Sequence, residues 1–480
     1  MTFRNQNISF LKGSEFLKKL KGLFADVIES VSGTEQDFTE GKLSRAIILL
    51  SIPAVLEMIM ESVFVVVDIY FVSKLGANAV ATVGITESMI TIVYAISIGL
   101  ATATTSMVSR RMGERNPDAA SKVAFQAILT GIAVSLIIGI TGALNAQRLL
   151  GLMGASDTIV TKMAGYTTIM LAGNIVIMLL FIINAIFRSA GDAAIAMRVL
   201  WVGNIINIIL DPCLIFGLGP FPHLGVAGAA VATNMGRGIA VMYQLYLLFF
   251  GKKRIQLSFN NLGIDFKLIG KLLKLSFGSI GQNLIGTTSW IALVRIISVF
   301  GSEVVAGYTI AIRIVSFILL PSWGISNAAA TLVGQNLGAK RPDRAEKSVI
   351  ITGLANMILL GTIGTVLVII PSPFIKIFIH DPGVIKAGVE CLRIVSMGFI
   401  AYGFGMVLVN SFNGAGDTST PLKINIFAFW CIEMPLAWLL AMKSGMNEEG
   451  VFVAIVIAES IMTFTAWIVF RRGKWKLKVV

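Results

Sequence analysis

Three acidic residues stand in one apolar stretch near the beginning of the chain, "SIPAVLEMIMESVFVVVDIYFV". Glu57, Glu61 and Asp68 are spaced so that, on a helix, they share a stripe about 80° wide with Pro53 and Phe64. A buried carboxylate costs free energy unless it is paired, protonated or bound to a cation, so this stripe is expected to face protein or a wet cavity. Pro53 removes one backbone hydrogen bond and predicts a bend in the same helix.

A second apolar stretch repeats this theme. In "GNIINIILDP", Asn204, Asn207 and Asp211 fall at positions i, i+3 and i+7 and line one face of a helix. Asp68 and Asp211 lie at comparable depth in their stretches, so the two carboxylates are predicted to meet. Desolvation and repulsion penalise two ionised carboxylates side by side, so such a pair is a natural site for H⁺ or Na⁺. The alternative is that both are neutral, hydrogen-bonded packing residues or helix caps.

The composition identifies the solvent of these helices. Of the 480 residues, 56% are hydrophobic and 14% are charged, whereas soluble domains average roughly 25% charged residues. Apolar runs recur that can cross about 30 Å of hydrocarbon as helices, and they are too long and too evenly apolar for barrel strands. The predicted fold class is an all-α polytopic membrane protein with twelve transmembrane helices. The runs cover 46–72, 84–108, 122–145, 160–187, 195–217, 226–250, 271–298, 307–332, 347–370, 384–412, 421–442 and 449–470.

The distribution of charge predicts the orientation. The chain has 39 Lys and Arg against 26 Asp and Glu, a net charge of +13, but most basic residues lie in the even-numbered loops and the two tails. This asymmetry follows the positive-inside rule, so both termini are expected in the cytoplasm and the chain in the plasma (inner) membrane. The basic charge is attributed to topology and anionic lipids, not to nucleic acid. Three cysteines and two histidines form no metal-ligand pattern and no disulfide framework.

An internal repeat divides the chain. A shift of 225 residues aligns "RMGERNPDAA" with "NLGAKRPDRA", and "AGD" at 190–192 with "AGD" at 415–417. Each repeat holds six spans, which predicts two parallel, pseudo-symmetric six-helix bundles related by an axis along the membrane normal. The predicted units are a cytoplasmic segment with an amphipathic interfacial helix (1–45), an N-lobe (46–250), a cytoplasmic linker with the start of the seventh span (251–274), a C-lobe (275–470) and a basic cytoplasmic tail (471–480).

The second half does not copy the acids of the first. Leu293 stands at the position of Asp68, and Glu433 lies beside the position that matches Asp211. Arg295 and Arg313 fall within the seventh and eighth spans, where pairing with carboxylates or carbonyls is more common than substrate binding. Ion binding is therefore expected in the first lobe, opposite a more basic second lobe.

The order of these motifs resembles that of a known family. The stretch "SIPAVLEMIMESVFVVVDIYFVSKLGANAVATVGI", the aligned pair above, "NAIFRSAGD" and "NIILDPCLIFGLG" are similar to segments of multidrug and toxic compound extrusion (MATE) transporters. The resemblance covers about residues 45–470 and is to the DinF-like branch. It implies a V-shaped pair of six-helix bundles that expels amphipathic, often cationic compounds in exchange for H⁺ or Na⁺.

The resemblance also implies roles for single residues. In the DinF-like branch, an aspartate of the first span and an Asn/Asp pair of the fifth form the ion site, and these roles fall on Asp68, Asn207 and Asp211. The asparagine of the fourth span falls on Asn184. Relatives often carry a threonine on the sixth span where this chain has Ala229, which argues against a complete Na⁺ shell and favours H⁺.

We therefore predict a monomeric efflux antiporter, not an enzyme, with small organic substrates and no cofactor besides the coupling ion. Ion binding would neutralise the aspartates and let the first helix bend at Pro53. The predicted ion site is Asp68, Asn184, Asn207 and Asp211, and the predicted cavity residues are Glu57, Glu61, Phe64 and Asp68. One alternative is a lipid-linked oligosaccharide or lipid flippase of the same wider superfamily, which would favour a more cationic cavity. The others are a membrane enzyme, for which no nucleophile–base pair stands at membrane depth, and a channel.

Overall fold

A computed structural model describes residues 22, 24–33, 36–251, 253–257 and 263–480, and within these ranges the chain is helical and forms no strand. Helices are the expected outcome for long apolar runs, because in hydrocarbon the backbone N–H and C=O groups must bond within their own segment. The elements of the N-terminal half are Leu43–Ser73 (α2), Ala77–Gly113 (α3), Pro117–Leu144 (α4), Ala146–Leu152 (α5), Asp157–Lys162 (α6), Ala164–Ala172 (α7), Asn174–Ala190 (α8), Ala193–Phe216 (α9) and Val226–Phe250 (α10). Those of the C-terminal half are Phe266–Ile297 (α11), Ser298–Phe300 (η2), Ser302–Gly338 (α12), Pro342–Ile369 (α13), Ser372–Lys376 (α14), Pro382–Met397 (α15), Phe399–Gly414 (α16), Ser419–Asn425 (α17), Ile426–Glu433 (η3), Met434–Met442 (α18), Asn447–Arg471 (α19) and Lys474–Leu477 (η4).

Among the described residues, ten helices are long and apolar enough to cross a membrane. The number is eleven if α15 and α16, which meet at a bend of 56°, form one span. At the place of the sixth predicted run, α10 is a continuous helix of 25 residues, about 37 Å long, and Asn234, Arg237 and Gln244 make it less apolar than the others. The prediction of an all-α, multi-span membrane protein is confirmed.

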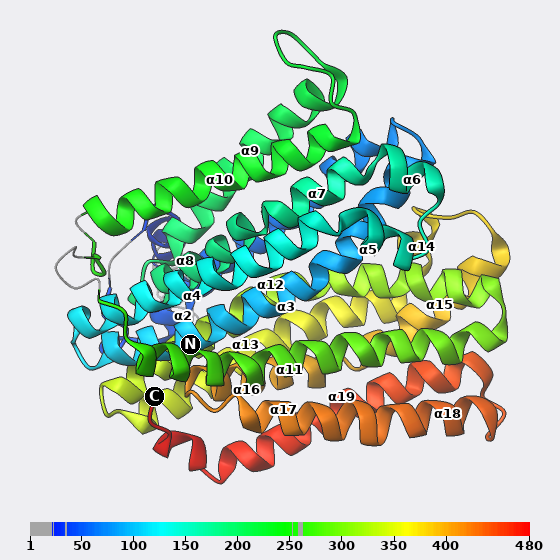
Figure 1. The fold of residues 1–480 in the computed structure, drawn as a ribbon. Coiled ribbons are helices and arrows are strands. Elements are labelled where there is room, and N and C mark those ends of the chain that lie inside the picture. Colours follow the sequence, from blue (N-terminus) through cyan, green and yellow to red (C-terminus); the bar gives the residue numbers. More distant parts are fainter. Residues whose placement is uncertain (1–21, 23, 34–35, 252, 258–262) are drawn as a thin grey trace, which may run out of the picture.

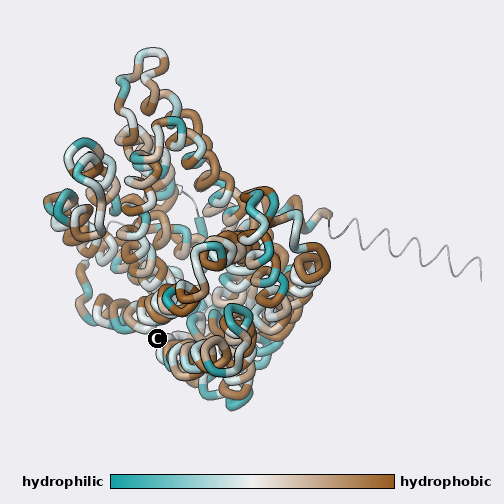
Figure 2. Tube along the Cα trace, turned by 90° about the vertical axis from the view of Figure 1, so that its right-hand side faces the viewer, coloured by the Kyte–Doolittle hydropathy of each residue, from teal (hydrophilic) through white to brown (hydrophobic). Residues whose placement is uncertain are grey.

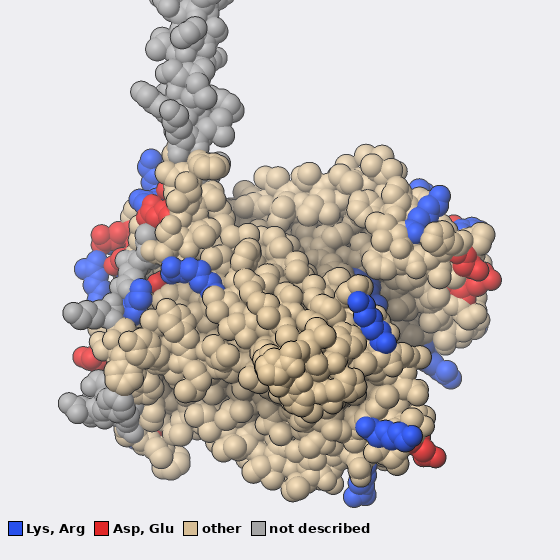
Figure 3. All heavy atoms as spheres, turned by 90° about the horizontal axis from the view of Figure 1, so that it is seen from above, with Lys and Arg blue, Asp and Glu red and all other residues tan. Residues whose placement is uncertain are grey.

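The helices form two bundles that lie side by side (Figure 1). The N-lobe, α2–α10, has α9 and α10 at its outer edge, and the C-lobe, α11–α19, has α17, α18 and α19 at the opposite edge. Apolar residues dominate the helices of both lobes (Figure 2). Seen from one side, Lys, Arg, Asp and Glu gather mainly toward the two ends of the molecule, while the middle is largely uncharged (Figure 3). Such an uncharged belt is what the hydrocarbon region of a bilayer requires.

The two lobes repeat each other in backbone detail. α3 and α12 begin and end 225 residues apart, and so do α4 and α13. In the turns that follow α3 and α12, Arg115 and Lys340 have the same left-handed φ of 57°. Pro117 and Pro342 then occupy the first turn of the next helix, where proline is favoured because its missing N–H would be unpaired in any case. The repeat seen in the sequence is therefore a repeat of structure.

Glycines let the two lobes approach each other where α3 and α12 end. Gly113 on α3 lies against the backbone oxygen of Gln335, and Gly338 on α12 lies against the backbone oxygen of Arg110. A Cβ atom at either glycine would overlap that oxygen, and a backbone atom cannot rotate out of the way, so only glycine permits this crossing. We call the end of the molecule that carries these turns and the C-terminus the terminal face, and the opposite end the distal face.

Two segments outside the bundles also tie the lobes together at the terminal face. Ahead of α2, Thr39 accepts a hydrogen bond of 2.7 Å from Arg341 of the C-lobe, while the neighbouring Glu40 pairs with Arg115 of the N-lobe at 2.9 Å. At the other end of the chain, Arg111 on α3 donates to the backbone oxygen of Val480 at 2.9 Å.

The predicted interfacial helix lies only in part within the described residues. Residues 24–32 are helical, with Phe24 and Ile28 exposed. An apolar exposed side of this kind suits a membrane surface. The rest of the predicted stripe falls within residues 1–21, outside the described part of the chain.

Candidate functional site

The structure brings together the two aspartates that the sequence predicts to meet. Asp68 on α2 is 8% exposed and Asp211 on α9 is fully buried, and their carboxyl groups lie within hydrogen-bonding reach of each other. Asp68 Oδ1 and Asp211 Oδ2 have no hydrogen-bond partner among the described residues. Two acceptors in contact, each with an unpaired oxygen, are the arrangement expected of a site that takes up a cation.

Asn207 connects this pair to α10. Its side-chain amide donates to Thr233 Oγ1 at 3.1 Å and lies 3.5 Å from Asp211 Oδ1. The contact depends on close packing of α9 and α10, because Gly203 and Gly236 face each other and a Cβ on Gly236 would meet the backbone oxygen of Gly203 at 2.5 Å. Asp68, Asp211, Asn207 and Thr233 therefore form one polar cluster, which we call the aspartate cluster.

Glu61 lies deeper in the lobe and is paired with an arginine. Arg237 on α10, only 4% exposed, donates from Nη2 to Glu61 Oε1 at 2.5 Å and from Nη1 to the hydroxyl of Tyr94 at 3.1 Å. Asn204 donates to the other Glu61 oxygen at 3.3 Å, and the Arg237 guanidinium stands 5.0 Å from the centre of the Phe64 ring. The charge of Glu61 is therefore balanced within the protein.

Glu57 has a separate arginine. Arg188 Nη1 lies 2.9 Å and 3.0 Å from the two oxygens of Glu57, and Asn184 donates to the same carboxylate at 2.9 Å. Gln244 in turn donates to Asn184 Oδ1 at 2.5 Å. Glu57 is 3% exposed and Asn184 is 4% exposed, so this network is cut off from solvent.

The predicted ion-site residues thus divide into two groups. Asp68, Asn207 and Asp211 lie together, whereas Asn184 belongs to the Glu57 network, which is eleven residues or about 16 Å away along α2. Pro53 lies one turn before Glu57, in a helix that runs unbroken from Leu43 to Ser73.

Several partners of the acids were not singled out by sequence reasoning. Thr233 stands one helical turn after Ala229, on the same side of α10, and supplies the hydroxyl that seemed to be missing there. Arg237 is one of four arginines within predicted spans, and such residues usually pair with a buried acid. Glu87, an exposed residue of α3, acts electrostatically on Asp68 and on Arg313 of α12.

The C-lobe differs as the sequence predicts. Leu293, which matches Asp68, is a fully buried core residue, and Glu433 is 2% exposed. Arg295 and Arg313 are both exposed. Their guanidinium groups form no ion pair within the part of the chain that the structure describes.

Comparisons with known proteins agree with this architecture. The family model MatE matches residues 53–213 and again 278–439, and the two matches begin 225 residues apart, as the repeat requires. Similar relatives include a probable multidrug resistance protein NorM of Thermotoga maritima (23% identity over 92% of this chain and 94% of that protein) and an FAD transporter of Shewanella oneidensis (24% over 90% and 95%). Another is the multidrug export protein MepA of Staphylococcus aureus (20% over 90% and 94%).

Solved structures share the fold. A MOP superfamily transporter from Pyrococcus furiosus superposes with a TM-score of 0.86 at 24% identity, covering 92% of this chain and 98% of that one. A multidrug resistance MATE family transporter in an outward-facing conformation superposes with a TM-score of 0.84 at 24% identity, with the same coverage. Because the family model matches more than half of the chain, in two copies that coincide with the two lobes, this chain belongs to the MatE family of membrane transporters.

Proposed function

We propose that the protein is a secondary active antiporter that exports amphipathic, cationic organic compounds in exchange for H⁺ or Na⁺. The observation that carries the proposal is the contact between Asp68 and Asp211, two buried carboxyl groups on different helices, each with an unpaired oxygen. The relatives named as multidrug resistance and multidrug export proteins support the class of substrate.

A proton is the ion that this contact favours. Two ionised carboxylates within hydrogen-bonding reach repel each other, and one shared proton converts the repulsion into a hydrogen bond. Thr233 and Asn207 hold the pair in place from α10 and α9. The oxygens of the same cluster could also bind Na⁺, so the experiment below includes both ions.

Ion binding at the aspartate cluster can reach the other lobe through α2. Asp68 lies near the distal end of this helix, while Ala54, next to Pro53, packs its backbone against Gly324 of α12. Because Pro53 lacks one backbone hydrogen bond, α2 can bend between these two contacts. Loading the cluster would therefore change how α2 rests on the C-lobe.

The glycine contacts at the terminal face indicate which side is closed. Gly113 and Gly338 bring α3 and α12 together there, so we assign the terminal face to the cytoplasm, with both termini inside the plasma membrane and the basic loops on anionic lipid. The described conformation then corresponds to an outward-facing state of a monomeric transporter.

The paired glutamates narrow the choice of substrate contact. The charges of Glu57 and Glu61 are balanced by Arg188 and Arg237, so neither has a free negative charge for a cation. Glu87, which is exposed, and the nearby aspartate cluster are the acids that remain for a positively charged substrate.

The proposal is tested with purified protein in liposomes that contain a pH-sensitive dye. Ethidium is added to drive exchange, and proton movement is recorded with and without a Na⁺ gradient. We expect ethidium-dependent proton movement that Asp68→Asn reduces at least tenfold. The control is Asp157→Asn, an exposed aspartate of the same lobe, which should leave transport unchanged. Unimpaired, ion-dependent transport by Asp68→Asn would refute the proposed coupling site.

A second candidate is the export of an organic anion, and the exposed Arg295 and Arg313 favour it together with the relative named as an FAD transporter. The same liposomes distinguish the two functions. If FAD drives ion movement and ethidium does not, and if Arg313→Gln abolishes the FAD response, the protein exports anions.

A further inference from the structure

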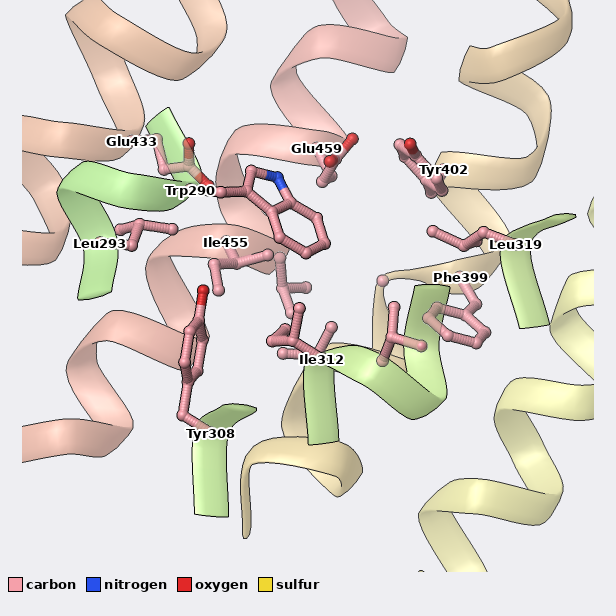
Figure 4. A pocket seen from close by; sticks show the side chains of 14 residues that line it. Trp290, Leu293, Tyr308, Ile312, Leu319, Phe399, Tyr402, Glu433, Ile455 and Glu459 are labelled. Atoms are coloured by element: carbon pink, nitrogen blue, oxygen red, sulfur yellow. The ribbon is translucent and has the colours of Figure 1, made fainter. Parts of the chain in front are cut away.

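A cavity in the C-lobe contains two acids that the N-lobe mechanism does not use. Its lining comes from α11, α12, α16, η3 and α19 together with the α15–α16 bend, and Figure 4 shows Glu433 and Glu459 on either side of Trp290. Fourteen residues line the cavity, and none of them is Lys, Arg or His. The two carboxyl groups therefore have no basic side chain in the wall that surrounds them.

Three oxygen atoms in this wall are buried and have no hydrogen-bond partner among the described residues. They are Glu433 Oε2, Glu459 Oε2 and the hydroxyl of Tyr308. Glu433 and Tyr308 are each only 2% exposed, so bulk water does not satisfy them. Buried polar atoms in native proteins are nearly always paired, and an unpaired set around one space indicates a missing partner.

The backbone directs Glu433 into this space. Glu433 is the last residue of η3, an eight-residue π-helix. π-helical segments are rare and often occur at functional sites. The wider helix changes the direction of the side chains that follow it, and Ser289 of α11 lies within hydrogen-bonding reach of the Glu433 carboxyl. The remaining wall is apolar or aromatic, with Phe399 and Tyr402 opposite (Figure 4).

Size and donor chemistry point to the occupant. The cavity has room for water-sized occupants of about 40 Å³, enough for a few such particles and far below the 300–1,000 Å³ typical of drug sites. Carboxylate and hydroxyl oxygens are the ligands of hard cations. Two negative charges without a basic neighbour favour a small cation over a neutral or anionic ligand.

We propose that the C-lobe cavity is a Na⁺ site in which Glu433 and Glu459 supply the charge and the Tyr308 hydroxyl supplies a further ligand. The site is separate from the aspartate cluster: it lies in the other lobe and shares no residue with it. It gives the second repeat an ion site of its own, at positions that the 225-residue repeat does not predict, because Glu459 matches Asn234 of the first half.

The test measures binding of ²²Na⁺ to purified protein, with choline chloride to hold the ionic strength. All proteins carry Asp68→Asn, so that the aspartate cluster is disabled and failure of the proposed coupling mechanism does not affect the result. We expect one Na⁺ per protein in this background. Glu433→Gln and Glu459→Gln should each weaken binding at least tenfold, and Tyr308→Phe several-fold. Glu390→Gln, an acid of α15 outside the cavity, should have no effect.

Two outcomes would overturn the proposal. One is that the Asp68→Asn protein binds no Na⁺, for example because the cavity takes only protons. The other is that Glu433→Gln and Glu459→Gln bind Na⁺ as tightly as their parent. Thermal unfolding in Na⁺-free buffer shows whether each variant is folded, and Tyr308→Phe, which removes one oxygen and keeps the ring, provides a second reading if a glutamine variant does not fold.

Discussion

The ion pair between Glu57 and Arg188 should contribute several kcal/mol to stability that neither residue provides alone. The two side chains are 4% and 14% exposed, and the nitrogen and oxygen atoms lie 2.9 Å apart. Unit charges about 4 Å apart attract by about 4 kcal/mol at an effective dielectric constant near 20. Removing one partner of a buried pair typically costs about 3–5 kcal/mol, because the other charge stays buried without compensation.

Single and double variants separate this coupling from other effects. Glu57→Gln keeps an acceptor for Arg188 and Asn184, so we expect the lower end, about 3 kcal/mol, while Arg188→Gln leaves the glutamate charge unbalanced and should cost about 4–5 kcal/mol. The double variant contains two neutral amides and should cost only about 1–2 kcal/mol relative to the native pair. The cycle therefore predicts a coupling energy of several kcal/mol.

The assay is equilibrium unfolding of the four proteins in mixed micelles, followed by circular dichroism. The control cycle uses Arg115 and Glu40, whose atoms are also 2.9 Å apart but whose side chains are 70% and 55% exposed. Exposed pairs are usually worth about 0–1 kcal/mol. If the buried pair couples no more strongly than this exposed one, the assignment of a dry interior around Glu57 is wrong.

Three further predictions concern packing, the ion site and pH. Gly113→Ala should destabilise the protein by about 1–3 kcal/mol, because its Cβ would overlap a backbone oxygen of α12; thermal unfolding should show a loss, whereas Gly286→Ala, with open space around it, should show none. Thr233→Val removes the hydroxyl that accepts from the site asparagine and should weaken apparent ion affinity several-fold in the liposome assay; unchanged affinity would exclude Thr233 from the site. Burial opposes the ionisation of Asp37, but hydrogen bonds from the nearby threonine and two arginines outweigh it and lower its pKa below 3.8. A depressed pKa in the folded state stabilises above the unfolded value, so proteolytic protection of the segment before α2 should be lost as pH falls below about 4, and Asp37→Asn should abolish that dependence.

The fold followed from the sequence because each signal was local or repeated. An apolar run must become a helix in hydrocarbon whatever surrounds it, and the turns around Arg115 and Lys340 have the same backbone because the same residue pattern precedes and follows them. The sixth span was the exception in strength, since α10 carries the polar residues that serve the aspartate cluster and the Glu61 pair.

Within the site, helical spacing placed the right residues on the right faces. Asp68 and Asp211 were expected at one depth and do meet, whereas Asn184 was assigned to that pair by family resemblance and instead contacts Glu57. The resemblance identified the helix correctly but could not tell which acid of α2 lies opposite position 184.

By itself, the sequence determined the solvent of the helices, the two-lobed repeat and the face of α2 on which acids gather, because composition and periodicity act along one segment at a time. Only the tertiary structure decided which acids are neutralised and which remain unpaired. Arg237 and Glu61 are 176 residues apart in sequence, and Glu433 and Glu459 stand on different helices around one cavity. The charge state of a buried carboxyl depends on the neighbour that helix packing places within a few ångströms, and no spacing along a single helix specifies that neighbour.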